Sequence, residues 1–129
     1  DHYARSMASY GVFLAACGFE YHGPKGHIGF APRITPEDFK AAFTSAEGWG
    51  TFRQTINEKS HEAEIELKYG SLLVRTLALA TTKKPKHLTV TVAGKNVACT
   101  HVFQENRVLI TLNESAQVNT GEKVALVFG

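Results

Sequence analysis

Residues 61–80 read HEAEIELKYGSLLVRTLALA, and this stretch decides the fold class of the chain. In its first half, small or aliphatic residues alternate strictly with glutamates. The apolar set is Ala63, Ile65 and Leu67, and the acidic set is Glu62, Glu64 and Glu66. A period of two indicates a β-strand with one buried face and one solvated face. We expect the twenty residues to form a long β-hairpin.

The same period of two continues on both sides of this stretch. Residues 51–56 (TFRQTI) alternate before it, and residues 87–103 (HLTVTVAGKNVACTHVF) predict two strands around the turn 94–96. Two more strands, in RVLITLN and KVALVFG, close the set around the turn 119–121. Short strands joined by tight turns predict a mainly β fold, an antiparallel β-sandwich or jelly roll of about eight strands.

The first third of the chain has a different pattern. In residues 1–17, apolar side chains recur every three or four positions and the run stops at Gly18, which predicts an N-terminal helix. The turn Gly23-Pro24-Lys25-Gly26 then predicts a hairpin. Thr35 and Pro36 suit a helix start, so we expect a short helix at 36–43. Residues 1–129 thus form one domain, a helix (1–17) followed by a β-sandwich (18–129).

Composition narrows the classes of partner. The chain has 129 residues and a formal net charge of +2, and its one basic cluster is Lys83, Lys84 and Lys86. Nucleic-acid binding needs several phosphate contacts along one face, so we expect no nucleic-acid partner. The sequence contains no apolar run long enough to cross a bilayer, and we expect no membrane partner. The cellular compartment stays open.

Two N-terminal segments carry a resemblance to a known family. Residues 2–19 (HYARSMASYGVFLAACGF) are similar to the closing helix of the catalytic (α/α)-barrel in glycoside hydrolase family 116, which includes bacterial relatives of non-lysosomal glucosylceramidase and β-glucosidase. Residues 18–54 resemble the segment that follows it in many bacterial members, most specifically in IGFAPR and AEGWGTF. The resemblance implies that Arg5 hydrogen-bonds a sugar, and that the chain is the C-terminal portion of such an enzyme with the parent glycosidase domain as a partner.

The catalytic carboxylates of that family lie on earlier helices and have no counterpart here. The resemblance therefore implies that this chain binds a sugar but does not cleave it. Our main expectation is a non-catalytic, carbohydrate-associated module that binds a glucan or another glycan without a cofactor. Trp49 lies between two glycines, which leaves its indole room either to stack on a sugar, with Tyr21 and Tyr69 as possible neighbours, or to cap the core. Tyr21, Glu20 and Glu47 are further candidate sugar contacts.

Two alternatives stay open. His22 and His27 bracket the first hairpin turn, and together with His101 they would offer three nitrogen ligands suited to copper or zinc. Such a site would make the chain a small metal-dependent jelly-roll enzyme acting on polysaccharide. The other alternative is a purely structural or interaction domain. The unused apolar face of the predicted N-terminal helix also leads us to expect a homodimer.

Overall fold

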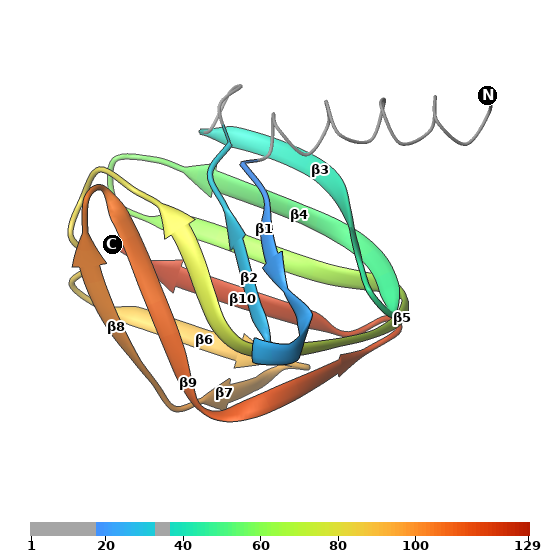
Figure 1. Cartoon of the computed structure of the whole chain (residues 1–129). Helices are drawn as coiled ribbons and strands as arrows, with labels where there is room; N and C mark the ends of the chain where they lie inside the picture. Colours follow the sequence, from blue (N-terminus) through green and yellow to red (C-terminus); the bar gives the residue numbers. More distant parts are fainter. Residues whose placement is uncertain (1–17, 33–36) are drawn as a thin grey trace.

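The computed structural model describes residues 18–32 and 37–129, and in these ranges the protein is mainly β (Figure 1). The strands are β1 (Glu20–His22), β2 (His27–Phe30), β3 (Asp38–Ser45), β4 (Gly48–Ile56), β5 (His61–Ala80), β6 (Leu88–Val92), β7 (Lys95–Val97), β8 (Cys99–Gln104), β9 (Arg107–Asn119) and β10 (Lys123–Phe128). A single 3-10 turn, η1 (Gly23–Lys25), joins β1 to β2. The helix expected at 1–17, and the homodimer inferred from it, concern residues outside those described. Within the described ranges, no helix is long and apolar enough to cross a membrane.

β5 organises the molecule, but it is not the hairpin that its sequence predicted. It is one continuous strand that bends near Gly70, where φ is +90°. Its two halves do not pair with each other: the first half pairs with β4 and β10, and the second with β2 and β9. Figure 1 shows the bend at the right-hand end of the view, with the two halves running in different layers.

The bend divides the strands into two groups that share β5. The first group runs β3-β4-β5-β10-β6-β7, and the second runs β1-β2-β5-β9-β8. All pairs are antiparallel except β2 with β5, which is parallel, so the sheet is mixed. β10 is the last strand in the sequence, yet it lies between β5 and β6.

Buried side chains from both groups form one hydrophobic core. At its centre, Phe30 of β2 stacks on Phe52 of β4 with ring centroids 3.9 Å apart. Phe43 of β3 packs edge-on against Phe30, with centroids 5.7 Å apart. Burial of each such ring stabilises the fold by about 2–3 kcal/mol. The core therefore depends on contacts between the two groups.

The short helix expected at 36–43 is wrong, because Asp38–Ser45 is the strand β3, paired with β4 along its whole length. Phe39 and Phe43 are four residues apart, a spacing that places them on one face of either a helix or a strand. Ala41 distinguishes the two, because it is only 6% exposed and lies on the same face as the two phenylalanines, as every second residue of a strand does. The ladder to β4 and this two-residue burial pattern outweigh the helix-start residues before them.

Candidate functional site

The bend of β5 brings two large aromatic side chains together at the surface. Trp49 of β4 is the register partner of Tyr69 of β5, whereas the next residue, Gly50, is opposite Leu67. Lys68 is therefore an extra residue, a β-bulge, and it reverses the side on which Tyr69 lies relative to the buried Leu67. Tyr69 therefore lies on the outer side, 67% exposed, next to Trp49, which is 45% exposed because it alternates with the buried Gly50 and Phe52. Of the two interpretations of Trp49, the structure supports the open indole and not the core position.

A glycine pair lies directly beside these aromatic residues. Gly48 and Gly70 are register partners, and a Cβ on Gly70 would lie 1.9 Å from the carbonyl oxygen of Glu47. Thr120 completes the bend: its hydroxyl accepts from the Gly70 amide at 2.9 Å and donates to the Gly70 carbonyl at 3.2 Å. The backbone at the bend is thus hydrogen-bonded to Thr120, and neither residue of the Gly48–Gly70 pair carries a side chain.

A hollow of about 410 Å³ lies on the other side of the glycine pair. Its lining residues are Tyr21, Gly23, Pro24, Ala46, Glu47, Ser71, Leu73 and Gln117. The Ser71 hydroxyl donates to Glu47 Oε2 at 3.0 Å, and the Ala46 amide donates to the Tyr21 hydroxyl at 3.3 Å. These bonds hold a carboxylate and a phenol in the same hollow.

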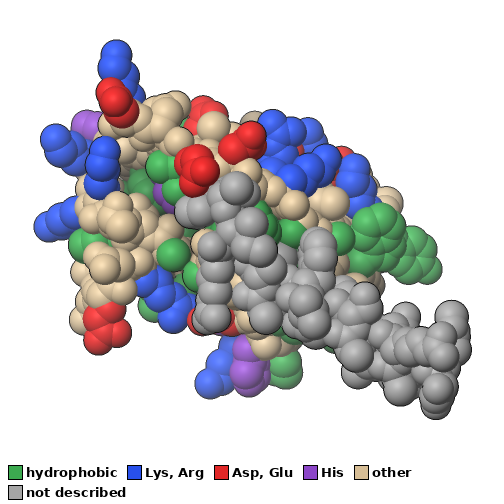
Figure 2. Space-filling view, turned by 90° about the horizontal axis from the view of Figure 1, so that it is seen from above, with side chains coloured by type: hydrophobic (Ala, Val, Ile, Leu, Met, Phe, Trp, Pro, Cys, Tyr) green, Lys and Arg blue, Asp and Glu red, His purple; other side chains and the backbone are tan. Residues whose placement is uncertain are grey.

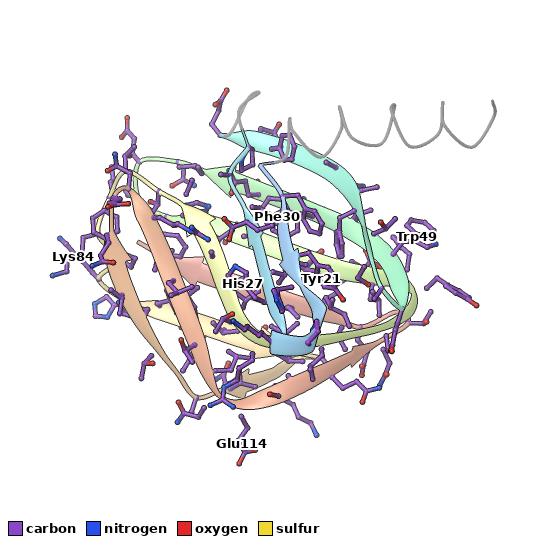
Figure 3. The ribbon with its side chains drawn as sticks, in the orientation of Figure 1. Tyr21, His27, Phe30, Trp49, Lys84 and Glu114 are labelled. Carbon is purple, nitrogen blue, oxygen red and sulfur yellow. The ribbon has the colours of Figure 1, made fainter. Side chains whose placement is uncertain are left out.

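We call this region the bend surface, made of Tyr21, Glu47, Trp49, Tyr69, Ser71 and Gln117. In Figure 3, Tyr21 and Trp49 lie toward the end of the molecule where β5 bends. Figure 2 shows hydrophobic side chains protruding at the same end of the face viewed from above. Exposed rings beside carboxylate, hydroxyl and amide groups suit a ligand that has both apolar faces and hydroxyl groups.

Glu20, another predicted sugar contact, belongs to a different cluster. Its Oε1 accepts from His27 Nε2 at 2.7 Å and also from the Arg107 guanidinium. Arg107 comes from β9, which is separated from β2 by β5. The small register partners Gly29 of β2 and Ala78 of β5 lie between Glu20 and Arg107. Burial alone would raise the pKa of Glu20, but the His27 hydrogen bond and the charge of Arg107 outweigh it and hold the pKa below its ordinary value. Glu20 is thus engaged in an ion pair at the surface.

The structure does not bring the three candidate metal ligands together. His22 and His27 are register partners, but His27 Nδ1 is hydrogen-bonded to Thr76 Oγ1 at 2.6 Å and its Nε2 is bonded to Glu20. His101 lies on β8, with β5 and β9 between it and β2, and it is the register partner of the buried Ile110. In residues 18–32 and 37–129, no group of three histidine, cysteine or acidic side chains could hold a metal ion.

Arg5 lies outside the described residues, so the structure does not place it. The site also contains residues that the sequence did not single out, namely Ser71 and Gln117, with Thr120 supporting the bend. The available signal was Gly70 inside an alternating stretch, because glycine within a strand marks a bulge or a close approach of another backbone. Tyr69 was an expected neighbour of Trp49 and is its register partner, whereas nothing in the sequence pattern placed Ser71, Gln117 or Thr120 at the bend.

Comparison with known proteins gives a fold likeness only. No family model matches the chain, and no curated protein matches it. Among solved structures, it is similar to a GH127 β-L-arabinofuranosidase from Geobacillus stearothermophilus T6, with 14% identity and a TM-score of 0.52. The match covers 99% of this chain and 18% of that enzyme, so this chain spans less than a fifth of its length. The fold therefore resembles part of that glycoside hydrolase chain, and the likeness does not point to family 116 in particular.

Proposed function

We propose that this chain is a non-catalytic, glycan-binding β-sandwich module of a larger glycoside hydrolase, and that it contacts glycan at the bend surface. The observation that carries the proposal is the exposed pair of Trp49 and Tyr69 beside the glycine pair Gly48 and Gly70. The two strand groups and their common core are the basis for treating the fold as a sandwich.

Stacking on aromatic rings is the first part of the binding. Sugar rings have apolar faces of C–H groups, and the Trp49 and Tyr69 rings offer apolar surface without the cost of burying a charge. The glycine pair lets the backbones of β4 and β5 approach closely, so no side chain stands between this aromatic pair and the hollow. A short oligosaccharide can thus lie across the bend.

Hydrogen bonds to sugar hydroxyls are the second part. The Glu47 carboxylate can accept from one hydroxyl while it keeps the bond from Ser71, since a carboxylate has about four lone-pair sites. Gln117 and the Tyr21 hydroxyl line the same hollow and can donate or accept. All of these groups are on the protein, so the proposed binding needs no metal.

The likeness to a β-L-arabinofuranosidase supports the association with a carbohydrate-active enzyme and suggests a second class of ligand to test. Trp49 is the sole tryptophan of the chain, so its emission reports on the bend surface alone. We expect gluco-oligosaccharides or arabino-oligosaccharides to shift this emission at millimolar concentration. No shift with either series up to their solubility limits would remove the binding proposal.

Variants locate the binding. Tyr69→Ala removes one stacking ring, worth about 1 kcal/mol, and should lower the affinity for the oligosaccharide about fivefold. Glu47→Gln should lower this affinity by a similar factor, and calorimetry measures the affinity of each variant. Val102→Ala is the matched control, because Val102 is 55% exposed but lies on β8, outside the bend surface. Equal losses in all three variants would show that binding occurs elsewhere.

A further inference from the structure

The exposed aromatic pair lies at one end of a longer outer face of the first strand group. Every second residue of β4 after Trp49 is on this face, because side chains two positions apart on a strand point to the same side of the sheet. These residues of β4 are Thr51, Arg53 and Thr55, and their register partners on β5 are Glu66, Glu64 and Glu62. The same face therefore continues from the aromatic rings along both strands.

A second hollow, of about 220 Å³, is present on this face. The outward-pointing side chains that line it are Arg53, Thr55, Glu62, Glu64, Ala125 and Val127. Ala125 of β10 is the register partner of Glu64, and its short side chain leaves space between the longer ones around it. Trp49 and Arg53 are four residues apart on β4, which places the hollow about 13 Å from the indole along the strand.

Two charged groups of this hollow are exposed and not engaged in an ion pair. Lys68 lies 3.2 Å from Glu66 and Lys123 lies 3.6 Å from Glu64, so these four charges are paired. Within residues 18–32 and 37–129, neither Arg53 nor Glu62 forms an ion pair, and both are exposed. A guanidinium only donates hydrogen bonds and a carboxylate only accepts them, whereas the hydroxyls of a sugar do both. The hollow therefore offers matching partners for neighbouring hydroxyls of one sugar ring.

We infer that one linear glycan chain occupies both places, with one sugar stacked on Trp49 and Tyr69 and a later sugar in the hollow beside Arg53. Val127 is 43% exposed at the edge of the hollow and adds apolar surface for the ring. The inference rests on the proposed glycan binding at the bend surface and adds the path of the chain, along β4 and β5 over the outer face. The ligand is thus an extended oligosaccharide or polysaccharide chain, and a single terminal sugar fills only part of the site.

Chain length is the first test, with cellobiose and cellohexaose as one pair of probes and α-1,5-arabinobiose and α-1,5-arabinohexaose as the other. A disaccharide stacked on the aromatic pair ends short of the hollow, whereas a hexasaccharide passes over it. In the series that binds, we expect calorimetry to show at least about tenfold tighter binding of the hexasaccharide, the effect of one hydrogen bond to a charged group. Equal affinities for the two lengths would overturn the inference.

Variants locate the second sugar. Arg53→Ala should lower the affinity for the hexasaccharide about tenfold and leave the disaccharide unchanged, because only the longer chain reaches the guanidinium. Ala125→Tyr should fill the hollow with the same selective effect. Arg75→Ala is the matched control, since Arg75 is also exposed but lies on the second half of β5, away from this face, and it should leave both affinities unchanged.

The outcomes separate this inference from the proposed function on which it rests. If Tyr69→Ala weakens binding of both lengths while Arg53→Ala and Ala125→Tyr weaken neither, the bend surface binds glycan and the extended path is wrong. If no oligosaccharide of either series binds, both proposals fall. A loss that is confined to the hexasaccharide in Arg53→Ala and Ala125→Tyr, and absent in Arg75→Ala, supports the path along β4 and β5.

Discussion

Single residues with perturbed surroundings give this fold two different responses to acid. His61 is buried among apolar groups, whereas Glu20 is held in an ion pair near the surface. Both have lowered pKa values, but for opposite reasons: burial disfavours the charged form of His61, and neighbouring hydrogen bonds and charge favour the charged form of Glu20. The two effects act in different ranges of pH.

His61 should make the fold less stable between pH 6.5 and pH 4. In this range the unfolded chain binds a proton on His61 and the folded chain does not, since the pKa falls from 6.5 to about 4 on folding. The free energy of unfolding is unaffected above pH 6.5 and should fall by up to about 3 kcal/mol as the pH reaches 4. Urea unfolding of the wild type and His61→Gln at pH 7, 5.5 and 4.5 measures this. Equal pH slopes in the two proteins would contradict it.

Glu20 should act at lower pH. Its folded pKa lies below the ordinary 4.5, so its ion pair stabilises the fold above pH 4.5, and this contribution is lost as the pH falls through the folded pKa. We expect Arg107→Gln to raise the pKa of the Glu20 carboxyl, because a cationic partner is removed. An NMR titration of the Glu20 side-chain carbon measures the pKa directly. Arg53→Gln, on β4, is the control and should leave it unchanged.

At the scale of elements, Gly70 is the residue that permits β5 to bend. A side chain there would meet the Glu47 carbonyl at 1.9 Å, and the positive φ disfavours any residue other than glycine. Gly70→Ala should lower the free energy of unfolding by at least about 1–3 kcal/mol. Gly94→Ala is a matched control with a similar φ of +81° and open space around it, so it should cost less. Denaturant unfolding compares the two, and an equal cost would show that the Glu47 contact is unimportant.

The strands were largely predictable, but their pairing was not. Alternation identified most strand segments and the turn at 119–121, because burial of one face imposes a period of two. It failed where local patterns are ambiguous: Phe39 and Phe43 suit a helix or a strand equally. It also treated β5 as a hairpin, since a bend and a turn both use glycine. Of the candidate site, Tyr21 and Glu47 line one hollow near the bend and Trp49 lies two residues beyond Glu47, whereas Glu20 pairs with Arg107, a residue 87 positions away in sequence.

At the scale of the whole molecule, the core is shared by both strand groups. Phe52→Ala removes a fully buried ring from the contact with Phe30 and should cost about 3–5 kcal/mol. Because the two groups share one core, we expect unfolding of this variant to stay a single transition. Hydrogen exchange of the β4 and β9 amides, followed across a denaturant series, should give one unfolding midpoint for both strands. That midpoint should equal the one measured for the whole chain by circular dichroism. Separate midpoints would show that the groups fold independently.

The position of β10 has a consequence for synthesis on the ribosome. Residues 123–128 fill the place between β5 and β6, so the hairpin of β6 and β7 cannot join β5 until those residues have left the exit tunnel. The first group is thus incomplete throughout most of translation, and its open edges at β5 and β6 are exposed to the nascent chains of neighbouring ribosomes. A chain that terminates before Lys123 lacks an interior strand, and we expect it to aggregate or be degraded as it emerges.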